Sequence, residues 1–371
     1  MYDIAIIGAG PAGTTLARLI GKNYRVLLVD RRDFSAHPDG LPQEKCCGGL
    51  LAPDAQLMLS RLGLGLPKSV LEEPQIFVVK AIDMDREIVR HYQRYYINMN
   101  RQKFDHWLLS MLPSGIDIRT NCRLKSYSRV NTHFKLELRE GDKSFVEQTK
   151  IIIGADGASS KVRRLFGKWN FPEKYFAIQE WVESSDNFPY FTSIFCSKIT
   201  DYYCWTIPKG NNLIIGAALS PHTNISEKFQ LLKENLKACG FQFGKKLRRE
   251  GAYILRPSGV RQLSVGSKGI ALLGEAGGWI SPSSAEGLSY ALKSALLLSK
   301  SLNEAEDAFE KRYSRYMMTL KANILLKNIK SRFIFNPRLR ALVMRSKLKS
   351  INVIETAGYG KPYLINKESH G

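Results

Sequence analysis

The first residues whose spacing could do chemistry are Gly8, Gly10 and Gly13, which form a GxGxxG pattern between an apolar run and a helical pattern. In such a pattern the first glycine permits a tight turn. The second lets the backbone approach a pyrophosphate, and the third lets the helix pack closely on the strand. The helix N-terminus then offers unpaired N–H groups to phosphate. The segment predicts a dinucleotide site.

Asp30 ends the next apolar run, where a carboxylate can accept hydrogen bonds from the hydroxyls of a ribose. An acid at this position favours a free ribose over a 2′-phosphate. We also place Ala12, in the glycine turn, and Arg31, beside Asp30, among the cofactor-binding residues. Strand, glycines, helix, second strand and acid occur in the order that this type of site requires.

Two further glycine-rich segments point to FAD rather than NAD. Residues 154–157 read GADG and are followed by Ser160 and Val162-Arg163, and residues 274–278 read GEAGG before Pro282 and Glu286. They resemble the GADGxxSxVR and GDAAG…P…GEG motifs of the FAD-dependent hydroxylase-like superfamily.

That resemblance implies that Asp156 lies in a turn supporting the cofactor. It also implies that Glu275, which replaces the usual Asp, lies at a ribityl hydroxyl, and that the helix after Pro282 points its N-terminus towards the flavin. Arg101 matches an arginine near the cofactor, and the alternative is an ordinary arginine at the start of a surface helix. The remaining residues that we assign to the cofactor on this basis are Gly157, Gly274, Gly277, Gly287 and Leu288.

Residues 44–50, EKCCGGL, distinguish the chain from generic hydroxylases. They resemble the KPCGGG segment of the geranylgeranyl reductase family, with Lys45, Cys46, Cys47 and Gly48 at the cofactor. Residues 203–208, YCWTIP, resemble the YxWxFP signature of the same family. The resemblance covers roughly residues 1–300 and is nearest to the CbrA-type subgroup.

The family resemblance implies reduction of isolated C=C bonds in prenyl lipid chains by hydride transfer from reduced flavin. Such an alkene needs a proton donor on its other carbon, and Cys47 is the family's candidate. Tyr203 and Trp205 alternate along a strand, so their rings share a face and could wall an apolar tunnel. The alternatives are a loop with two unremarkable thiols and ordinary packing of sheet aromatics.

The order of apolar runs predicts an α/β (α+β) chain: a Rossmann-like FAD-binding domain with an inserted antiparallel-sheet substrate domain and a helical C-terminal segment. At 371 residues the chain exceeds the usual size of one core, which favours more than one domain. We assign residues 1–75, 98–172 and 256–302 to the FAD-binding domain. Residues 76–97 and 173–255 form the substrate domain, and residues 303–371 the basic helical segment.

The net charge of +21 favours anionic partners. Between Lys311 and Ile354 the sequence has no Asp or Glu, and basic and apolar residues alternate at helical spacing. This pattern suits the surface of an anionic membrane, but also a set of helices that cap the protein with a solvated basic face. Nucleic acid is disfavoured as a partner because no recognised nucleic-acid module accompanies the charge.

The N-terminus lacks a signal-peptide pattern, no apolar run reaches the length of a membrane span, and six cysteines indicate no disulfide scaffold. We therefore expect a cytoplasmic protein, at most peripheral at the inner membrane face, without a metal site. No second GxGxxG is present, so electrons would come from transiently bound NAD(P)H or from ferredoxin. A monooxygenase of hydrophobic or aromatic substrates and a non-catalytic flavin- or lipid-binding protein remain alternatives.

Overall fold

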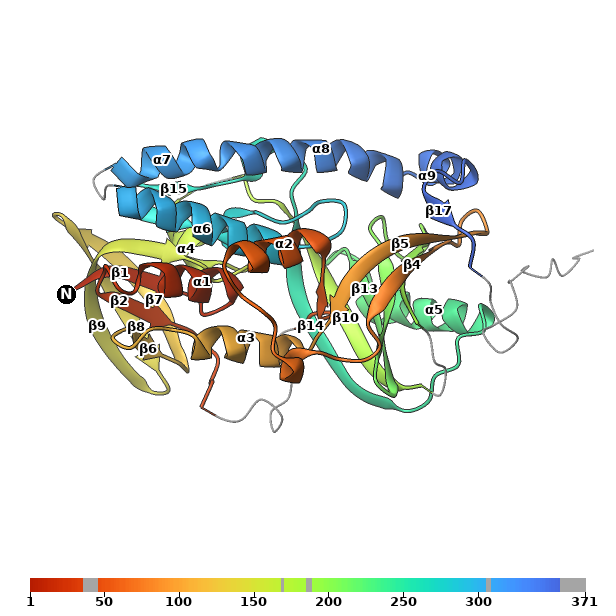
Figure 1. Cartoon of the computed structure of the whole chain (residues 1–371), viewed down its shortest axis with the longest axis horizontal. Helices are drawn as coiled ribbons and strands as arrows, with labels where there is room; N and C mark the ends of the chain where they lie inside the picture. Colours follow the sequence, from red (N-terminus) through yellow and green to blue (C-terminus); the bar gives the residue numbers. More distant parts are fainter. Residues whose placement is uncertain (36–45, 168–169, 185–188, 305–307, 354–371) are drawn as a thin grey trace, which may run out of the picture.

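The computed structural model describes residues 1–371 except 36–45, 168–169, 185–188, 305–307 and 354–371. Two sheets lie side by side along the long axis of the molecule, with helices α6, α7 and α8 running over the first and towards the second (Figure 1). The predicted fold class, a Rossmann-like domain joined to a second sheet and a helical C-terminal segment, is confirmed.

The first sheet has the strand order β15-β16-β9-β1-β2-β6, with β7 and β8 continuing from β9 as an antiparallel meander. Strand β1 pairs in parallel with both β2 and β9. Its residues are almost all buried, as parallel strands covered on both faces must be. The strands are β1 Tyr2–Ile7, β2 Val26–Val29, β6 Asp117–Arg119, β7 Cys122–Val130, β8 His133–Glu140, β9 Lys143–Gly154, β15 Gly266–Ser267 and β16 Ile270–Leu272.

The second sheet has the order β14-β10-β13-β12-β11-β4-β5-β17, and β3 pairs with β5. All neighbours are antiparallel except β4 and β11, and α5 packs on one face through Phe229, Leu232 and Leu236. The strands are β3 Leu50–Leu51, β4 Ile76–Asp83, β5 Ile88–Asn98, β10 Glu173–Glu183, β11 Tyr190–Phe195, β12 Cys204–Lys209, β13 Asn212–Leu219, β14 Lys246–Arg256 and β17 Ser350–Ile351.

Helix α1 lies between the first sheet and α6, because Leu16 and Ile20 share one buried cluster with Ala295 and Leu298. Figure 1 also shows that α3 lies on the other side of α1 from α6. The helices are α1 Pro11–Ile20, α2 Pro53–Arg61, α3 Arg101–Ser110, α4 Lys161–Phe166, α5 Ile225–Ala238, α6 Leu288–Glu304, α7 Phe309–Tyr316, α8 Met318–Phe335 and α9 Pro337–Arg345.

The C-terminal segment joins both sheets. Helix α7 packs on the first sheet through Phe309 and Tyr313, and β17 adds an antiparallel strand to β5. On α9 the buried Arg340 donates to Asp83 at 2.8 Å and to Asp85 at 2.9 Å, at the β4–β5 turn. The segment is therefore an integral layer of the folded protein.

One expected helix begins later than the sequence pattern indicated. The prediction placed a helix from about Ser283, but α6 starts at Leu288 because residues 282–284 form a turn and Ala285 has a left-handed backbone (φ +49°). Glu286 then accepts hydrogen bonds from the backbone and hydroxyl of Ser289, which caps the first turn. The expectation that the helix starts directly after Pro282 is wrong.

Candidate flavin site

The three glycine-rich turns meet in space. Gly8 has a left-handed backbone (φ +112°), and a Cβ there would lie 2.4 Å from the carbonyl oxygen of Ala155 in the second turn. A Cβ on Gly13 would lie 1.9 Å from the oxygen of Gly8, so only glycine allows α1 to approach β1 this closely. In the third turn, a Cβ placed on Gly274 would lie 3.5 Å from the Cβ of Ala12 in the first turn.

The mouth of this junction suits a pyrophosphate. Around the ideal Cβ of Gly10 no described atom lies within 4 Å, and the same holds for Gly157. Gly10 is the N-cap of α1 and brings no side-chain hydrogen bond, which leaves the first N–H groups of the helix available. The open approach to unpaired backbone donors fits the phosphates of FAD.

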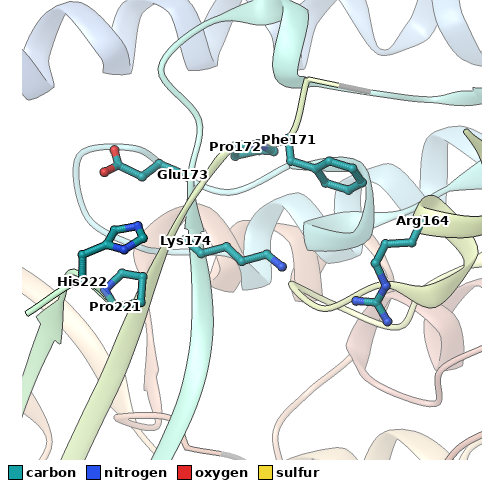
Figure 2. Close-up of a pocket in the computed structure, with 7 residues that line it drawn as sticks. All are labelled: Arg164, Phe171, Pro172, Glu173, Lys174, Pro221 and His222. Atoms are coloured by element: carbon teal, nitrogen blue, oxygen red, sulfur yellow. The ribbon is translucent and has the colours of Figure 1, made fainter. Parts of the chain in front are cut away.

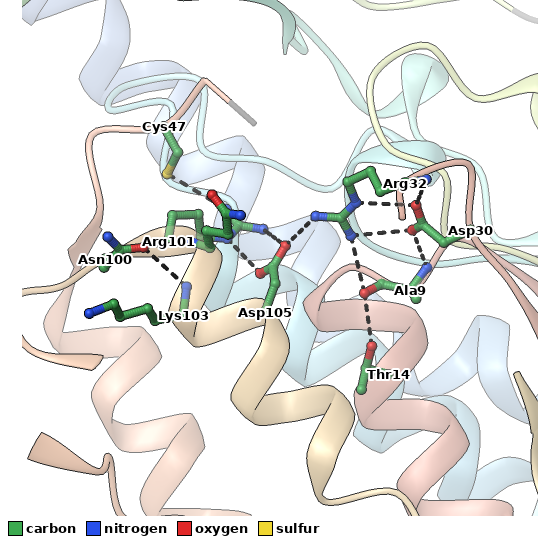
Figure 3. Close-up of polar contacts among 10 residues, drawn as sticks. Ala9, Thr14, Asp30, Arg32, Cys47, Asn100, Arg101, Lys103 and Asp105 are labelled. Atoms are coloured by element: carbon green, nitrogen blue, oxygen red, sulfur yellow. Dashed lines mark hydrogen bonds and ion pairs between the residues drawn. The ribbon is translucent and has the colours of Figure 1, made fainter. Parts of the chain in front are cut away.

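Asp30 holds the first turn from the end of β2 (Figure 3). Its Oδ2 accepts from the backbone N–H of Ala9 at 2.6 Å, and its Oδ1 accepts from the backbone N–H of Arg32 at 2.8 Å. The guanidinium of Arg32 also donates to Oδ1 at 3.1 Å and to Oδ2 at 3.2 Å, so a ribose hydroxyl would have to replace one of these bonds. Arg31, which the sequence placed at the cofactor, is exposed, whereas Arg32 ion-pairs with Asp30 at 3.1 Å.

Asp105 on α3 connects this turn to the cysteines (Figure 3). It is buried and binds Arg32 at 2.7 Å and Arg101 at 2.7 Å. Arg101 in turn donates to Sγ of Cys47 over 3.6 Å. Burial lowers the pKa of Arg101, but Asp105 and Cys47 raise it by more. We call Asp30, Arg32, Arg101 and Asp105 the polar network.

The cysteine loop (residues 46–49) lies between the polar network and the second sheet. Sγ of Cys46 contacts the carbonyl oxygen of Ala177 on β10 at 3.6 Å, and Gln179 donates to the carbonyl oxygen of Cys47 at 3.3 Å. Gly48 packs so tightly on Ile207 that a Cβ would lie 2.4 Å from its Cδ1. Lys45, also assigned to the cofactor, lies outside the described residues.

Lys209, at the end of β12, binds the backbone of the same loop. Its ammonium donates to the carbonyl oxygens of Gly49 at 3.2 Å and Met99 at 2.8 Å, and to the side chain of Asn98. The side chain is almost fully buried, and burial lowers the pKa of Lys209 to about 8. The sequence analysis missed this residue, although it directly follows the aromatic signature.

The second sheet contributes an aromatic surface beside Cys46. The rings of Tyr203 and Trp205 lie 5.5 Å apart, so they share a face. The ring of Tyr202 is 5.0 Å from that of Tyr203, and Phe335 of α8 is 4.9 Å from Tyr202. Tyr203 donates to the carbonyl oxygen of Ser284 at 2.9 Å, which ties the sheet to the turn before α6. The aromatic cluster consists of Tyr175, Tyr202, Tyr203, Trp205 and Phe335.

Asp156 and Glu275, the acids of the two later glycine-rich segments, make hydrogen bonds within the protein. Asp156 accepts from Lys161 N–H at 2.6 Å and Val162 N–H at 3.2 Å, and so caps α4. Burial raises the pKa of Asp156 despite these bonds. Glu275 reaches across to β14, where its Oε1 accepts from Leu255 N–H at 2.8 Å. The extra methylene relative to Asp gives Glu275 this reach.

The glycines after Gly274, and Leu288 at the start of α6, pack against neighbouring side chains. A Cβ on Gly277 would lie 2.3 Å from the indole nitrogen of Trp279, and Gly287 packs 3.7 Å from Ile280. Leu288 is buried with Leu51 and Phe104 in the cluster between α2, α3 and α6. Close approach thus requires glycine at positions 8, 13, 154 and 277, whereas at Gly287 a Cβ would make only ordinary contact.

A separate hollow of about 460 Å³ opens beside α4 and the start of β10 (Figure 2). None of the residues predicted for the cofactor lines it. Its lining consists of Arg164, Phe171, Pro172, Glu173, Lys174, Pro221 and His222. In the part of the chain that the structure describes, no group of three or more His, Cys, Asp or Glu side chains is arranged to hold a metal ion.

Comparison with known proteins agrees with this geometry. Residues 1–181 match the family model of the FAD-binding domain. Protein CbrA of Escherichia coli O6:H1 is 38% identical over 351 residues, covering 94% of this chain and 94% of that protein. Protein CbrA of Shigella sonnei is likewise 38% identical and is covered to 98%.

Two solved structures illustrate how widely the fold is shared. A geranylgeranyl bacteriochlorophyll reductase-like protein from Thermoplasma acidophilum has a TM-score of 0.78 at 19% identity, covering 92% of this chain and 90% of that one. PqsL of Pseudomonas aeruginosa, a probable FAD-dependent monooxygenase, has a TM-score of 0.66 at 16% identity, covering 93% and 99%.

Fold, converging glycine turns and family match together define a FAD-dependent oxidoreductase, so the expected cofactor is confirmed. Within this class the chain belongs to the family of the CbrA proteins, the subgroup that its sequence resembled. The two solved structures are a reductase-like protein and a probable monooxygenase. Because their sequence identities to this chain are below 20%, they establish the fold alone.

Proposed function

We propose that the chain is a flavin-dependent reductase that saturates C=C bonds in a hydrophobic, prenyl-type substrate. The observation that carries this proposal is the position of Cys47. Its Sγ touches Arg101 of the polar network, while its neighbour Cys46 packs in the aromatic cluster. The thiol therefore lies where a cofactor held by the glycine turns and an apolar substrate held by the aromatic rings would meet.

When bound, FAD in its reduced form supplies the hydride. Cys47 holds the proton that the second alkene carbon receives. Its Sγ accepts from the backbone N–H of Gly49 at 3.4 Å and from Arg101 at 3.6 Å, so two donors hold the thiol in place. Arg101 and Lys209 thus act as positioning residues, because they fix the loop that carries the thiol.

Tyr203 and Trp205 bind the substrate chain in this proposal. Trp205 is buried and Tyr203 is partly buried, and the Tyr203 hydroxyl is already bonded to Ser284. Burial raises the pKa of Tyr203 well above its usual value, which keeps the phenol neutral. The neutral rings offer apolar area and exclude water, which suits a hydrocarbon chain.

The remaining assignments accompany this function. Asp30 binds the ribose, the N-terminus of α1 binds the pyrophosphate, and a nicotinamide cofactor or ferredoxin supplies electrons from outside. A prenyl-type substrate places the protein in the cytoplasm, peripherally at the inner face of the membrane. Among the described helices, none combines the length and hydropathy needed to cross a bilayer.

The decisive experiment is single turnover without oxygen. Holoprotein is reduced chemically under anaerobic conditions and mixed with a geranylgeranyl lipid, while flavin absorbance and product mass are followed. The proposal expects reoxidation of the flavin and a product heavier by two hydrogens per bond. Product formation only after admission of oxygen, with an oxygen atom gained, would identify a monooxygenase. A flavin that no reductant reduces would identify a non-catalytic protein.

A further inference from the structure

Helices α8 and α9 expose an unusual amount of apolar surface. Nine of the twenty exposed large hydrophobic side chains among the described residues lie between positions 318 and 348. Leu326 is 66% exposed and Leu342 is 69% exposed. Most of the others recur at helical spacing along one side of α8 or on α9. The outer apolar face consists of Leu325, Leu326, Ile329, Phe333, Leu339, Leu342 and Val343.

Cations accompany this face without any anion. Exposed Arg332, Arg338 and Arg345 lie on the same two helices, followed by exposed Lys347 and Lys349. The sequence has no Asp or Glu from position 311 to 354. An apolar row among cations is the pattern of helices that lie in the headgroup region of anionic lipid.

The outer apolar face is held rigidly. Arg340 anchors α9 through its buried ion pairs with Asp83 and Asp85. Lys327 pairs with Asp54 of α2 at 3.5 Å, and Asn323 accepts from Tyr290 of α6. In Figure 1 these helices form the upper edge of the molecule, with α6 beneath the start of α8 and β17 beneath α9. Because its inner side is so fixed, the segment presents its outer side as a preformed surface.

We propose that α8 and α9 dock flat on an anionic lipid bilayer through the outer apolar face. Pairing with a second copy is disfavoured, since a two-fold contact would oppose two sets of cations without counter-charges. A nucleic acid would leave the leucines and Phe333 without an apolar partner.

The docked orientation has a consequence that rests on the proposed function. Phe335, in the last turn of α8, points inward and stacks on Tyr203 with ring centroids 6.4 Å apart. Phe333, two residues earlier, is exposed on the outer side. The two side chains lie on opposite sides of α8, so the width of one helix separates the bilayer from the aromatic cluster, and a lipid chain would enter the site beside the end of α8.

Co-flotation with vesicles tests the docking. Purified holoprotein is mixed with vesicles of phosphatidylglycerol and phosphatidylcholine, or of phosphatidylcholine alone. The wild type should float with the anionic vesicles and much less with the neutral ones. Arg338→Gln should weaken binding about fivefold. Leu326→Glu and Leu342→Glu should each weaken it at least about tenfold.

Matched controls lie on the first sheet. Val146 on β9 is 57% exposed, and Arg123 on β7 is exposed, so Val146→Glu and Arg123→Gln repeat both changes away from the outer apolar face and should float like the wild type. Equal flotation with both vesicle types, or weakening by the controls to the same extent, would overturn the proposal. So would a dimer in light scattering that Leu326→Glu dissociates while vesicles are not bound. Because flotation needs no turnover, anaerobic reduction of detergent-dispersed substrate would leave the reductase proposal standing if docking failed.

Discussion

The two surroundings of the cysteine loop differ in almost every physical respect. Towards the first sheet lies the polar network, in which buried Asp105 joins Arg32 and Arg101. Towards the second sheet lies the aromatic cluster, where Trp205 is 8% exposed and its indole nitrogen has no hydrogen-bond partner among the described residues. Charge in fixed geometry suits a phosphate-bearing cofactor, and neutral rings suit a hydrocarbon. This difference supports our proposal that the flavin lies on the first side and the substrate on the second.

The largest effect is expected where the two sides meet. Cys47→Ala should lower the rate of alkene reduction at least about 100-fold, because it removes the proton donor. Flavin content should stay unchanged, as the glycine turns are untouched. Cys239→Ala, at the end of α5, is the matched control and should keep the wild-type rate. Stopped-flow flavin reoxidation measures both, and an unaltered rate for Cys47→Ala would remove this thiol from the chemistry.

On the polar side, Asp105→Asn should destabilise the fold by about 3–5 kcal/mol, because it leaves the buried Arg101 without its counter-charge and removes one of the two ion pairs of the partly buried Arg32. Urea unfolding of the flavin-free protein measures the change. Asp142 pairs with Arg139 on the surface and is fully exposed. Asp142→Asn should therefore cost less than about 1 kcal/mol. Equal losses in both variants would mean that the polar network contributes no more than a surface pair.

Buried Lys209 on β12, which holds the cysteine loop, makes the stability of the protein depend on pH. Burial lowers the pKa of Lys209 to about 8, against 10.5 for the ordinary side chain. Between these values the unfolded chain binds a proton that the folded chain has released, so the free energy of unfolding rises with pH, by up to about 1.4 kcal/mol per pH unit. In Lys209→Met this rise should vanish, whereas Lys135→Met, at an exposed position on β8, should retain it. Urea titrations between pH 8 and 10 compare the slopes, and parallel slopes in all three proteins would contradict the assignment.

The smallest effect is expected on the aromatic side. Phe335→Ala removes a ring that lies 4.9 Å from Tyr202, and should raise KM for a prenyl-type substrate about threefold to tenfold. The rate at saturation and the flavin content should stay the same. Phe333→Ala, exposed on the same helix, should leave KM for detergent-dispersed substrate unchanged. If Phe335→Ala lowered flavin content instead, the aromatic cluster would belong to the cofactor.

Local pattern predicted much of this protein. The β-α-β unit around Gly8, Gly10 and Gly13 depends on steric rules that act within a few residues, and α1 follows the glycine turn as predicted. Residues 76–97, which the sequence assigned to an antiparallel sheet, likewise lie in the antiparallel pair β4 and β5. The turn at Ala285 was missed because the same residues could extend a helix, and only contacts with Tyr202 and Tyr203 hold them in another backbone conformation.

The sequence by itself determined the FAD-binding class, the cysteine loop and the basic helical C-terminal segment, because each is recognised from short motifs or patterns of neighbouring residues. Only the tertiary structure decided that Arg32 rather than Arg31 faces Asp30, that Lys209 supports Gly49, and that Phe335 completes the aromatic cluster. The residues in the last two contacts are more than a hundred positions apart. Residue type shows what a side chain can do, but burial and partners arise only when distant segments pack together.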